Sequence, residues 1–267
     1  MTNIFVEHQK PKGSSSKEIT YATCLESYFI IDYNTIMEKH PHITFHLNKT
    51  LDLRIAVHFF KFPEARAGFD FIKEICQEHP KMKPFLSYSK KKRAEAVIKY
   101  VKNFYKIEVD ALKKAKKDFQ CIWDKIENDF FNLCEPIFGN LPWPSGKYEG
   151  YISILPIGPR FLTNKTFQTY WLWRNNLKGQ VIHELLHFQF YNLIDRMPDA
   201  KSLSNDKIWQ LSEIFNDIVQ KEKDFVKIQG YVPKQGYPDH IPLLPHYRTI
   251  WEKNKTAEGF IRSCISE

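Results

Sequence analysis

The longest regular pattern in this chain runs from Lys90 to Glu135, a stretch that contains neither proline nor glycine. Apolar residues recur there every seven positions, at Ile98, Tyr105, Leu112, Phe119, Ile126 and Leu133. Spacing of this kind places the apolar side chains on one face of a helix. The pattern therefore predicts one long helix, or two nearly collinear ones, with an apolar stripe against the body of the protein.

The residues before this stretch give shorter signals. Ile19 to Cys24 and Ile43 to Leu47 are short apolar runs that predict strands, on either side of a helix near Leu25 to Lys39. Leu53 to Glu78 has a helical pattern that is interrupted near Pro63, because proline cannot continue a helix. The N-terminal half is therefore expected to be mostly helical.

The residues after Glu135 alternate between strand and helix signals. Glu149 to Pro156 is rich in β-branched and aromatic residues, and Thr166 to Trp173 alternates large and polar residues, so both runs predict strands. Leu177 to Ile194 contains no proline and is apolar around most of its circumference, which is typical of a buried helix. Pro198 follows soon after the expected end of this helix.

A second amphipathic helix is predicted from Asn205 to Gln220, with Asn205 or Asp206 as its N-cap. Gly230 to Arg248 is rich in proline and glycine and predicts an irregular segment. Together these elements predict an α+β fold: a mostly helical region at 1–145, then a small mixed sheet packed on a helix pair at 146–267. The two regions can pack as one unit, since only residues 139–146 resemble a boundary.

The buried helix carries His183-Glu184-Leu185-Leu186-His187, the pentapeptide signature of zinc metallopeptidases. Residues four apart lie on one face of a helix, so the two imidazoles can bind one metal ion. Glu184 lies about 100° around the helix from His183, where its carboxylate can take a proton from a water on the metal. The alternative is a pair of core histidines that hydrogen-bond to backbone carbonyls.

A catalytic zinc site needs a third protein ligand. The metzincin pattern requires a glycine and a histidine farther along the same helix, but this chain has Phe190 and Leu193 there. On the second helix, Glu213 is the candidate third ligand. Asp217 is one turn away on the same face, where it could accept the second ring N–H of a ligand histidine. The alternative for these two acidic residues is a solvated helix face.

The pentapeptide followed 25 residues later by Glu213-x-x-x-Asp217 resembles the gluzincins, the thermolysin-like clan of zinc peptidases. The resemblance covers about residues 148 to 220 and singles out no individual family. It implies that His183, His187 and Glu213 bind Zn²⁺, that Glu184 is the general base and acid, and that Asp217 orients a histidine. The Gly-x-Met-x-Asn motif of the aminopeptidase branch is missing from the sequence, which favours an endopeptidase or oligopeptidase.

The same resemblance implies an edge strand that pairs with extended substrate, and a group that stabilises the oxyanion. The edge could be either predicted strand or residues 160–165 between them. His240, His246 and Tyr247, in the irregular segment after the second helix, are the candidates for the oxyanion. The alternative is that they only pack and hydrogen-bond within a proline-rich cover.

Composition sets the context for this chemistry. The chain of 267 residues is 43% hydrophobic, which is enough for a large core in one domain or two. It has no apolar run of membrane-spanning length, no signal-peptide pattern and five scattered cysteines, so we expect a reduced, cytoplasmic protein. Much of the net charge of +8 lies in the first half of the long helical stretch, which we interpret as a solvated face. We therefore expect neither nucleic acid nor a membrane as a partner, and the sequence indicates no oligomeric state.

Two functions compete on these grounds. The first is a zinc-dependent peptidase that acts on peptide or protein substrates through a metal-activated water, with Glu184 as the base. The second is a non-proteolytic zinc-binding scaffold that serves as a regulatory or binding module. The presence of Glu184 favours the peptidase, because a decayed enzyme tends to lose its base before its metal ligands.

Overall fold

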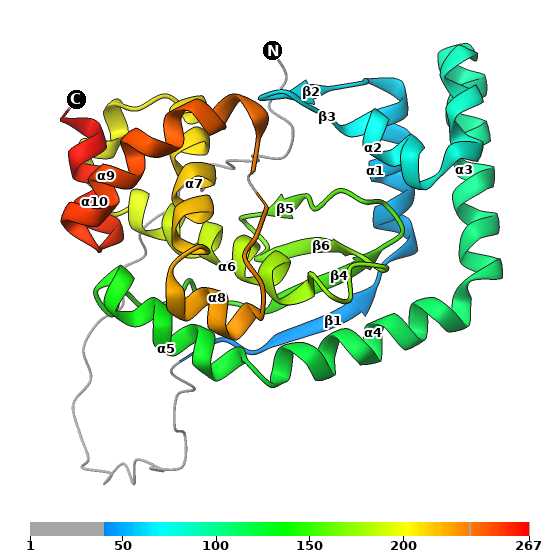
Figure 1. Cartoon of the computed structure of the whole chain (residues 1–267). Helices are drawn as coiled ribbons and strands as arrows, with labels where there is room; N and C mark the ends of the chain where they lie inside the picture. The colour runs from blue at the N-terminus through cyan, green and yellow to red at the C-terminus, as the bar shows by residue number, and fades with distance from the viewer. Residues whose placement is uncertain (1–39, 235, 267) are drawn as a thin grey trace, which may run out of the picture.

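A computed structural model of the protein describes residues 40–234 and 236–266. The strand predicted at Ile19 to Cys24 and the helix predicted near Leu25 to Lys39 lie outside the described residues. The helices are α1 (Lys49–Lys61), α2 (Phe71–Glu78), α3 (Lys90–Ile107), α4 (Val109–Asp124), α5 (Glu127–Phe138), α6 (Leu177–Ile194), α7 (Asn205–Val219), α8 (Lys223–Gln229), α9 (Leu244–Asn254) and α10 (Ala257–Ile265). Three 3-10 segments join them: η1 (Pro80–Ser87), η2 (Pro198–Ser202) and η3 (Pro238–Leu243). The α+β class is confirmed, with helices in the majority (Figure 1).

A small mixed sheet stands at the centre of the fold. It contains β1 (Ile43–Leu47), β4 (Tyr148–Ser153), β6 (Thr166–Tyr170) and β5 (Arg160–Phe161), in the order β1-β4-β6-β5. The first three strands are parallel, and β5 pairs antiparallel with β6 at the edge. Since β1 comes from the N-terminal half and pairs directly with β4, the two halves of the chain share one sheet.

The middle of the sheet depends on close packing around Gly150 of β4. Gly150 pairs with Phe45 on one side and with Phe167 on the other. A Cβ atom at this position would lie 2.6 Å from Phe45 Cε1 and 3.0 Å from Phe167 Cζ. The two rings meet edge to face across the glycine, with centroids 6.3 Å apart. Only glycine leaves room for both rings here.

The prediction of one long helix over Lys90 to Glu135, or two nearly collinear ones, is wrong. The stretch forms three helices, and α3 meets α4 at a sharp corner next to Glu108 (Figure 1). The apolar stripe of α3 packs against α1, whereas that of α4 packs against β1 and α6. Because these partners lie in different directions, a single straight helix could not contact both. Ile107 and Val109, at the corner, are 67% and 38% exposed.

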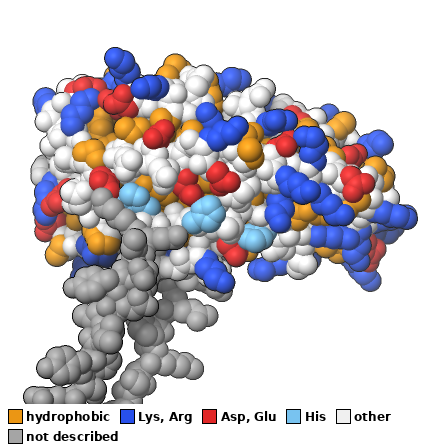
Figure 2. All heavy atoms as spheres, turned by 90° about the horizontal axis from the view of Figure 1, so that it is seen from below, with side chains coloured by type: hydrophobic (Ala, Val, Ile, Leu, Met, Phe, Trp, Pro, Cys, Tyr) orange, Lys and Arg blue, Asp and Glu red, His pale blue; other side chains and the backbone are white. Residues whose placement is uncertain are grey.

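The lysines of α3 and α4 form an exposed basic surface at this end of the molecule, where Lys and Arg side chains gather in the view from below (Figure 2). The exposed ones on these two helices are Lys90, Lys91, Lys92, Lys99, Lys102, Lys106, Lys113, Lys114, Lys116 and Lys117. Their outward positions follow from the apolar stripe, which occupies the inward face of each helix. No helix in the described part of the chain is long and apolar enough to cross a bilayer.

The predicted interruption of the helix near Pro63 is confirmed. A hairpin of β2 (Ala65–Arg66) and β3 (Phe69–Asp70) lies there, between α1 and α2.

On α1, the carboxylate of Asp52 is fully buried. It accepts hydrogen bonds of 2.7–2.9 Å from Tyr105, Ser153, Gln168 and the backbone N–H of Ile154. Asp52 therefore ties α1 and α3 to the end of β4 and to the middle of β6.

The starts of α6, α7 and α9 agree only in part with those that the sequence predicts. The bounds of α6 are those predicted, and α7 begins at Asn205, but its N-cap is Ser204. The prediction of Asn205 or Asp206 as N-cap is therefore wrong, because the Ser204 hydroxyl accepts from the backbone N–H of Lys207 at 3.2 Å. The prediction of an irregular segment through Arg248 is also wrong, since α9 begins at Leu244. Proline is well tolerated in the first turn of a helix, and Pro245 stands there.

Candidate metal centre

Three donor atoms meet where α6 packs against α7. His183 Nε2 lies 3.0 Å from His187 Nε2, and these nitrogens lie 3.2 and 3.4 Å from Glu213 Oε2. For zinc bound at about 2.0–2.1 Å in a tetrahedral site, two ligand atoms are about 3.3 Å apart. The three atoms therefore form one face of a tetrahedron of the right size, and two imidazoles with a carboxylate are a donor set that zinc prefers.

The packing of α6 on α7 fixes this arrangement. Asn216 of α7 donates to the backbone carbonyl of His183 at 2.8 Å, and Gln220 donates to that of Gly179 at 2.6 Å. Both amides lie on the face of α7 that contacts α6. They hold Glu213 opposite the two histidines.

Burial and charge keep two of the three donors in metal-binding form. The side chains of His187 and Glu213 are 0% and 3% exposed. Burial, together with the positive charge of Arg160, lowers the pKa of His187 to about 3, so its ring is neutral near pH 7. Burial opposes ionisation of Glu213, but His187 and Arg160 outweigh it and hold the pKa well below its usual range. The side chain of His183 is 28% exposed and opens the group toward solvent.

Glu184 lies beside the metal-binding group without belonging to it. Gln180 donates to its Oε1 at 2.9 Å, whereas its Oε2 is buried and has no hydrogen-bond partner among the described residues. Burial raises the pKa of this carboxyl to about 7, although the charges of His183 and Arg160 lower it. A carboxyl with a pKa near neutrality and one unpartnered oxygen is suited to exchange a proton.

Arg160, on the edge strand β5, is a site residue that the sequence reasoning missed. Its Nη2 lies 3.0 Å from Glu213 Oε1 and its Nη1 lies 3.9 Å from Glu184 Oε2. The guanidinium thus neutralises the carboxylate oxygen of Glu213 that faces away from the histidines. The only signal for it was its place in residues 160–165, one of the segments considered for the edge strand.

Asp217 forms no hydrogen bond or ion pair with a histidine among the described residues. Its Oδ1 accepts from Lys221 Nζ at 2.7 Å, and its Oδ2 is buried without a hydrogen-bond partner among the described residues. The second ring nitrogen of His183, Nδ1, instead faces Gln220 Oε1 at 3.2 Å. The buried Nδ1 of His187 has no hydrogen-bond partner in the described part of the chain. Gln220 is therefore the residue placed to fix the tautomer of His183.

The three residues considered for the oxyanion are placed differently. His240 is buried at the rim of the cavity, beside Trp209 and Tyr237. Tyr247 lies on α9, where its hydroxyl accepts from Lys207 at 2.7 Å, and His246 is an exposed neighbour on the same helix. Neither of these two is among the described residues that line the cavity.

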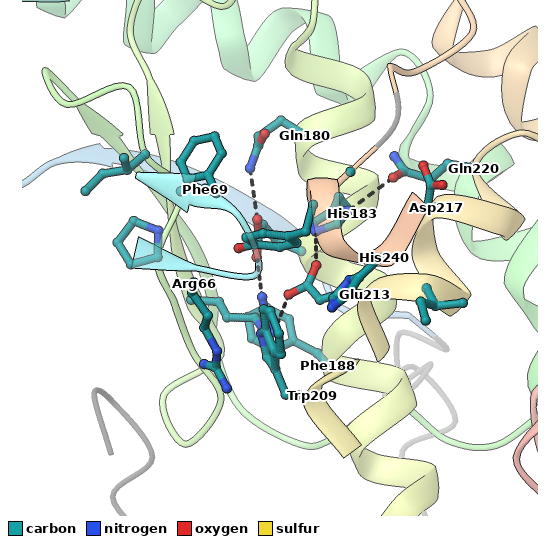
Figure 3. A pocket seen from close by; sticks show the side chains of 18 of the residues that line it. Arg66, Phe69, Gln180, His183, Phe188, Trp209, Glu213, Asp217, Gln220 and His240 are labelled. Carbon is teal, nitrogen blue, oxygen red and sulfur yellow. Dashed lines mark hydrogen bonds and ion pairs between the residues drawn. The ribbon is translucent and has the colours of Figure 1, made fainter. Parts of the chain in front are cut away.

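A cavity of about 1490 Å³ adjoins the metal-binding group (Figure 3). Its lining includes His183, Glu184 and Glu213, with β5 and the following residues along one side. Burial raises the pKa of the Tyr237 hydroxyl at the same cavity, and the charges of Glu213 and Glu184 add to the effect. β5 is one edge of the sheet, and Arg160 of this strand lines the same cavity.

A second group of donors, His42, Asp124 and Glu127, lies at the far edge of the sheet. Glu127 Oε1 already accepts from the backbone N–H of Ile43 and from Trp123 Nε1, both at 2.8 Å. Its Oε2 lies 2.7 Å from His42 Nδ1, and the side chain of His42 is about half exposed at 51%. The structural contacts of Glu127 account for this group.

Comparison of the chain with protein-family models, with curated proteins and with solved structures finds no significant match.

Proposed function

We propose that this protein is a zinc-dependent peptidase that hydrolyses peptide bonds, with Glu184 as the general base. The observation that carries the proposal is the position of Glu184. It lies one residue after the candidate ligand His183, it is a buried residue of the cavity lining, and its Oε2 has no hydrogen-bond partner among the described residues. A scaffold that only binds zinc has no need of a buried carboxylate with a pKa near 7 at this point.

The roles of the residues follow from their contacts. A zinc ion held by His183, His187 and Glu213 would supply a Lewis acid that polarises a carbonyl and acidifies a water molecule. Glu184 would take the proton of the attacking water and pass it to the leaving amine. Gln180 would orient the Glu184 carboxylate by donating a hydrogen bond to Glu184 Oε1, so that Glu184 Oε2 is the oxygen that would accept the proton.

Arg160 would keep Glu213 ionised and correctly turned. Its ion pair uses Oε1 of Glu213, so Oε2 stays directed at the two histidines. His240 remains the candidate for the oxyanion among the three that the sequence offered, because it alone lines the cavity. As an edge strand of the sheet, β5 would align an extended substrate.

The alternative is a non-proteolytic scaffold that uses the same zinc site as a regulatory or binding module. The two functions are separated by zinc content, measured by mass spectrometry, together with chelator-sensitive cleavage of an unfolded protein substrate. The peptidase proposal expects about one zinc per chain and cleavage that stops on chelation. Zinc retained without any cleavage would favour the scaffold. His42→Ala is the matched control, since it alters the other histidine-containing group and should leave zinc content unchanged.

A further inference from the structure

The β2–β3 hairpin has a tight two-residue turn at its tip, and its base leads directly into α2. Arg66 pairs with Phe69, so the turn consists of Ala67 and Gly68, with φ of 46° and 79°. Two consecutive residues with positive φ are the pattern of a type I′ turn, which suits a tight hairpin. The last residue of the hairpin, Asp70, caps α2 by accepting from the backbone N–H of Lys73 at 3.0 Å.

The tip of the hairpin docks on η3, about 170 residues farther along the chain. The carbonyl of Ala67 accepts from the backbone N–H of Asp239 at 3.2 Å. A Cβ atom on Gly68 would lie 2.9 Å from Pro238 Cβ and 2.9 Å from Asp239 Oδ1. The backbone of the tip is thus in direct contact with η3, and glycine is needed for this approach.

The sides of the hairpin contact α7 and the aromatic residues beside it. The guanidinium carbon of Arg66 lies 3.7 Å from the centroid of the Trp209 ring, and its Nη2 lies 3.1 Å from Asp206 Oδ1. The Phe69 ring meets that of Tyr237 edge to face, with centroids 6.0 Å apart. The hairpin therefore reaches from α2 to the opposite wall of the cavity, formed by α7 and η3.

The hairpin spans the cavity that adjoins the metal centre. Arg66 and Phe69 line this cavity together with His183, Glu184 and Glu213. In Figure 1 the hairpin extends above β5 toward α7, and in the close view Arg66 and Phe69 lie on one side of the pocket, with His183 and Glu213 on the other (Figure 3). The hairpin is thus joined to α2 at one end and contacts α7 and η3 at the other, while two of its side chains line the cavity.

We infer that the β2–β3 hairpin is a bridge over the substrate path, so that the substrates are unfolded peptide segments with a free end. Such a segment enters the passage end first and lies along β5. A segment held between two folded domains can enter only when the hairpin leaves η3 and α7. This inference rests on the proposed peptidase function and adds the class of substrate to it.

Two features of the site support this class of substrate. The cavity of about 1490 Å³ exceeds the range of about 300–1,000 Å³ that is usual for small-molecule sites, and an extended peptide would fill it. The hairpin is held on η3 and α7 by non-covalent contacts alone, and the Arg66 side chain is 44% exposed. The state in which the hairpin has left η3 and α7 is therefore only slightly populated. A substrate with a folded domain at both ends can bind only in that state.

The test uses one unstructured sequence in three forms: a free quenched-fluorescent peptide, the peptide fused at one end to a small folded domain, and the peptide fused at both ends. The measured quantity is kcat/KM. The free and singly fused forms should be cleaved at equal rates, and the doubly fused form roughly tenfold or more slowly, in proportion to the open fraction. Arg66→Ala with Phe69→Ala should raise the rate on the doubly fused form relative to the free peptide.

Arg262→Ala is the matched control for Arg66, because Arg262 is 52% exposed and pairs with Asp199, and neither residue is in the described lining of the cavity. It should leave the ratio of rates unchanged. Hydrogen exchange of the Asp239 amide should be faster in the double variant Arg66→Ala/Phe69→Ala than in the wild type. The melting temperature of the double variant checks that it is folded. Arg66→Ala alone serves as a milder variant. Equal cleavage of all three forms by the wild type would overturn the bridge and leave the peptidase intact. Cleavage of none would overturn both.

Discussion

Asp52 gives a prediction that does not depend on the metal centre. Its carboxylate is fully buried and accepts four hydrogen bonds, which favour the ionised form. Burial outweighs these bonds and raises the pKa from its ordinary value of 3.8 to about 6. The folded protein therefore holds this proton more tightly than the unfolded chain does.

The sign and size of the effect follow from linkage. The stabilisation from a raised pKa is fully present below pH 3.8 and is lost as the pH rises through about 6. The difference between the two pKa values corresponds to about 3 kcal/mol of unfolding free energy. Asp52→Asn keeps the shape of the side chain and cannot ionise, so this part of the pH dependence should vanish.

The assay is urea denaturation of the wild type and of Asp52→Asn at several pH values between 4 and 7. The free energy of unfolding of the variant minus that of the wild type should rise by about 2.4 kcal/mol over this range, because part of the effect is already lost at pH 4. Taking the difference removes the titration of the other groups, which both proteins share. A constant difference would show that Asp52 does not titrate here. A falling difference would show that the four donors outweigh burial.

Three further predictions concern the site and the sheet. His183→Ala should abolish stoichiometric zinc. It should also abolish the gain of about 2.7 kcal/mol in unfolding free energy that zinc at 100 times its Kd gives the wild type, so that added zinc no longer raises the melting temperature in calorimetry. Gln220→Ala should weaken zinc affinity by roughly 10- to 100-fold in a competition titration, because Gln220 and not Asp217 faces His183 Nδ1. Asp217→Ala should weaken zinc less, and the reverse order would restore Asp217 as the orienting residue. Gly150→Ala should cost about 1–3 kcal/mol in urea denaturation, because its Cβ would meet Phe45 and Phe167, whereas Gly236→Ala meets nothing within 4 Å and should be neutral.

The sequence predicted the structure best where a helix has a strong apolar pattern and residues that mark its two ends. α6 has the predicted bounds because its apolar residues surround it and proline is absent from it. The group His183, His187 and Glu213 was predicted from spacing on two helices, since helix geometry places residues four apart on one face. The positions of these residues required no knowledge of the rest of the fold.

Features that depend on tertiary packing could not be predicted in this way. The corner at Glu108 exists because α3 and α4 pack on different partners, while the seven-residue spacing continues through it. Arg160 reaches Glu213 only because β5 pairs antiparallel with β6 next to α6. The placement of Gln220 instead of Asp217 beside His183 depends on the rotation of α7 about its axis, to which a four-residue spacing is insensitive.

The central claim is that Glu184 acts on the reaction and not as a metal ligand. The most direct test is cleavage of a quenched-fluorescent peptide library by the wild type and by Glu184→Gln, with zinc content and melting temperature measured on the same samples. The variant should keep its zinc and its fold and lose roughly 10²–10⁴-fold in rate, since Gln cannot accept the proton. Loss of zinc in the variant, or a wild type that cleaves nothing in the library, would contradict the claim.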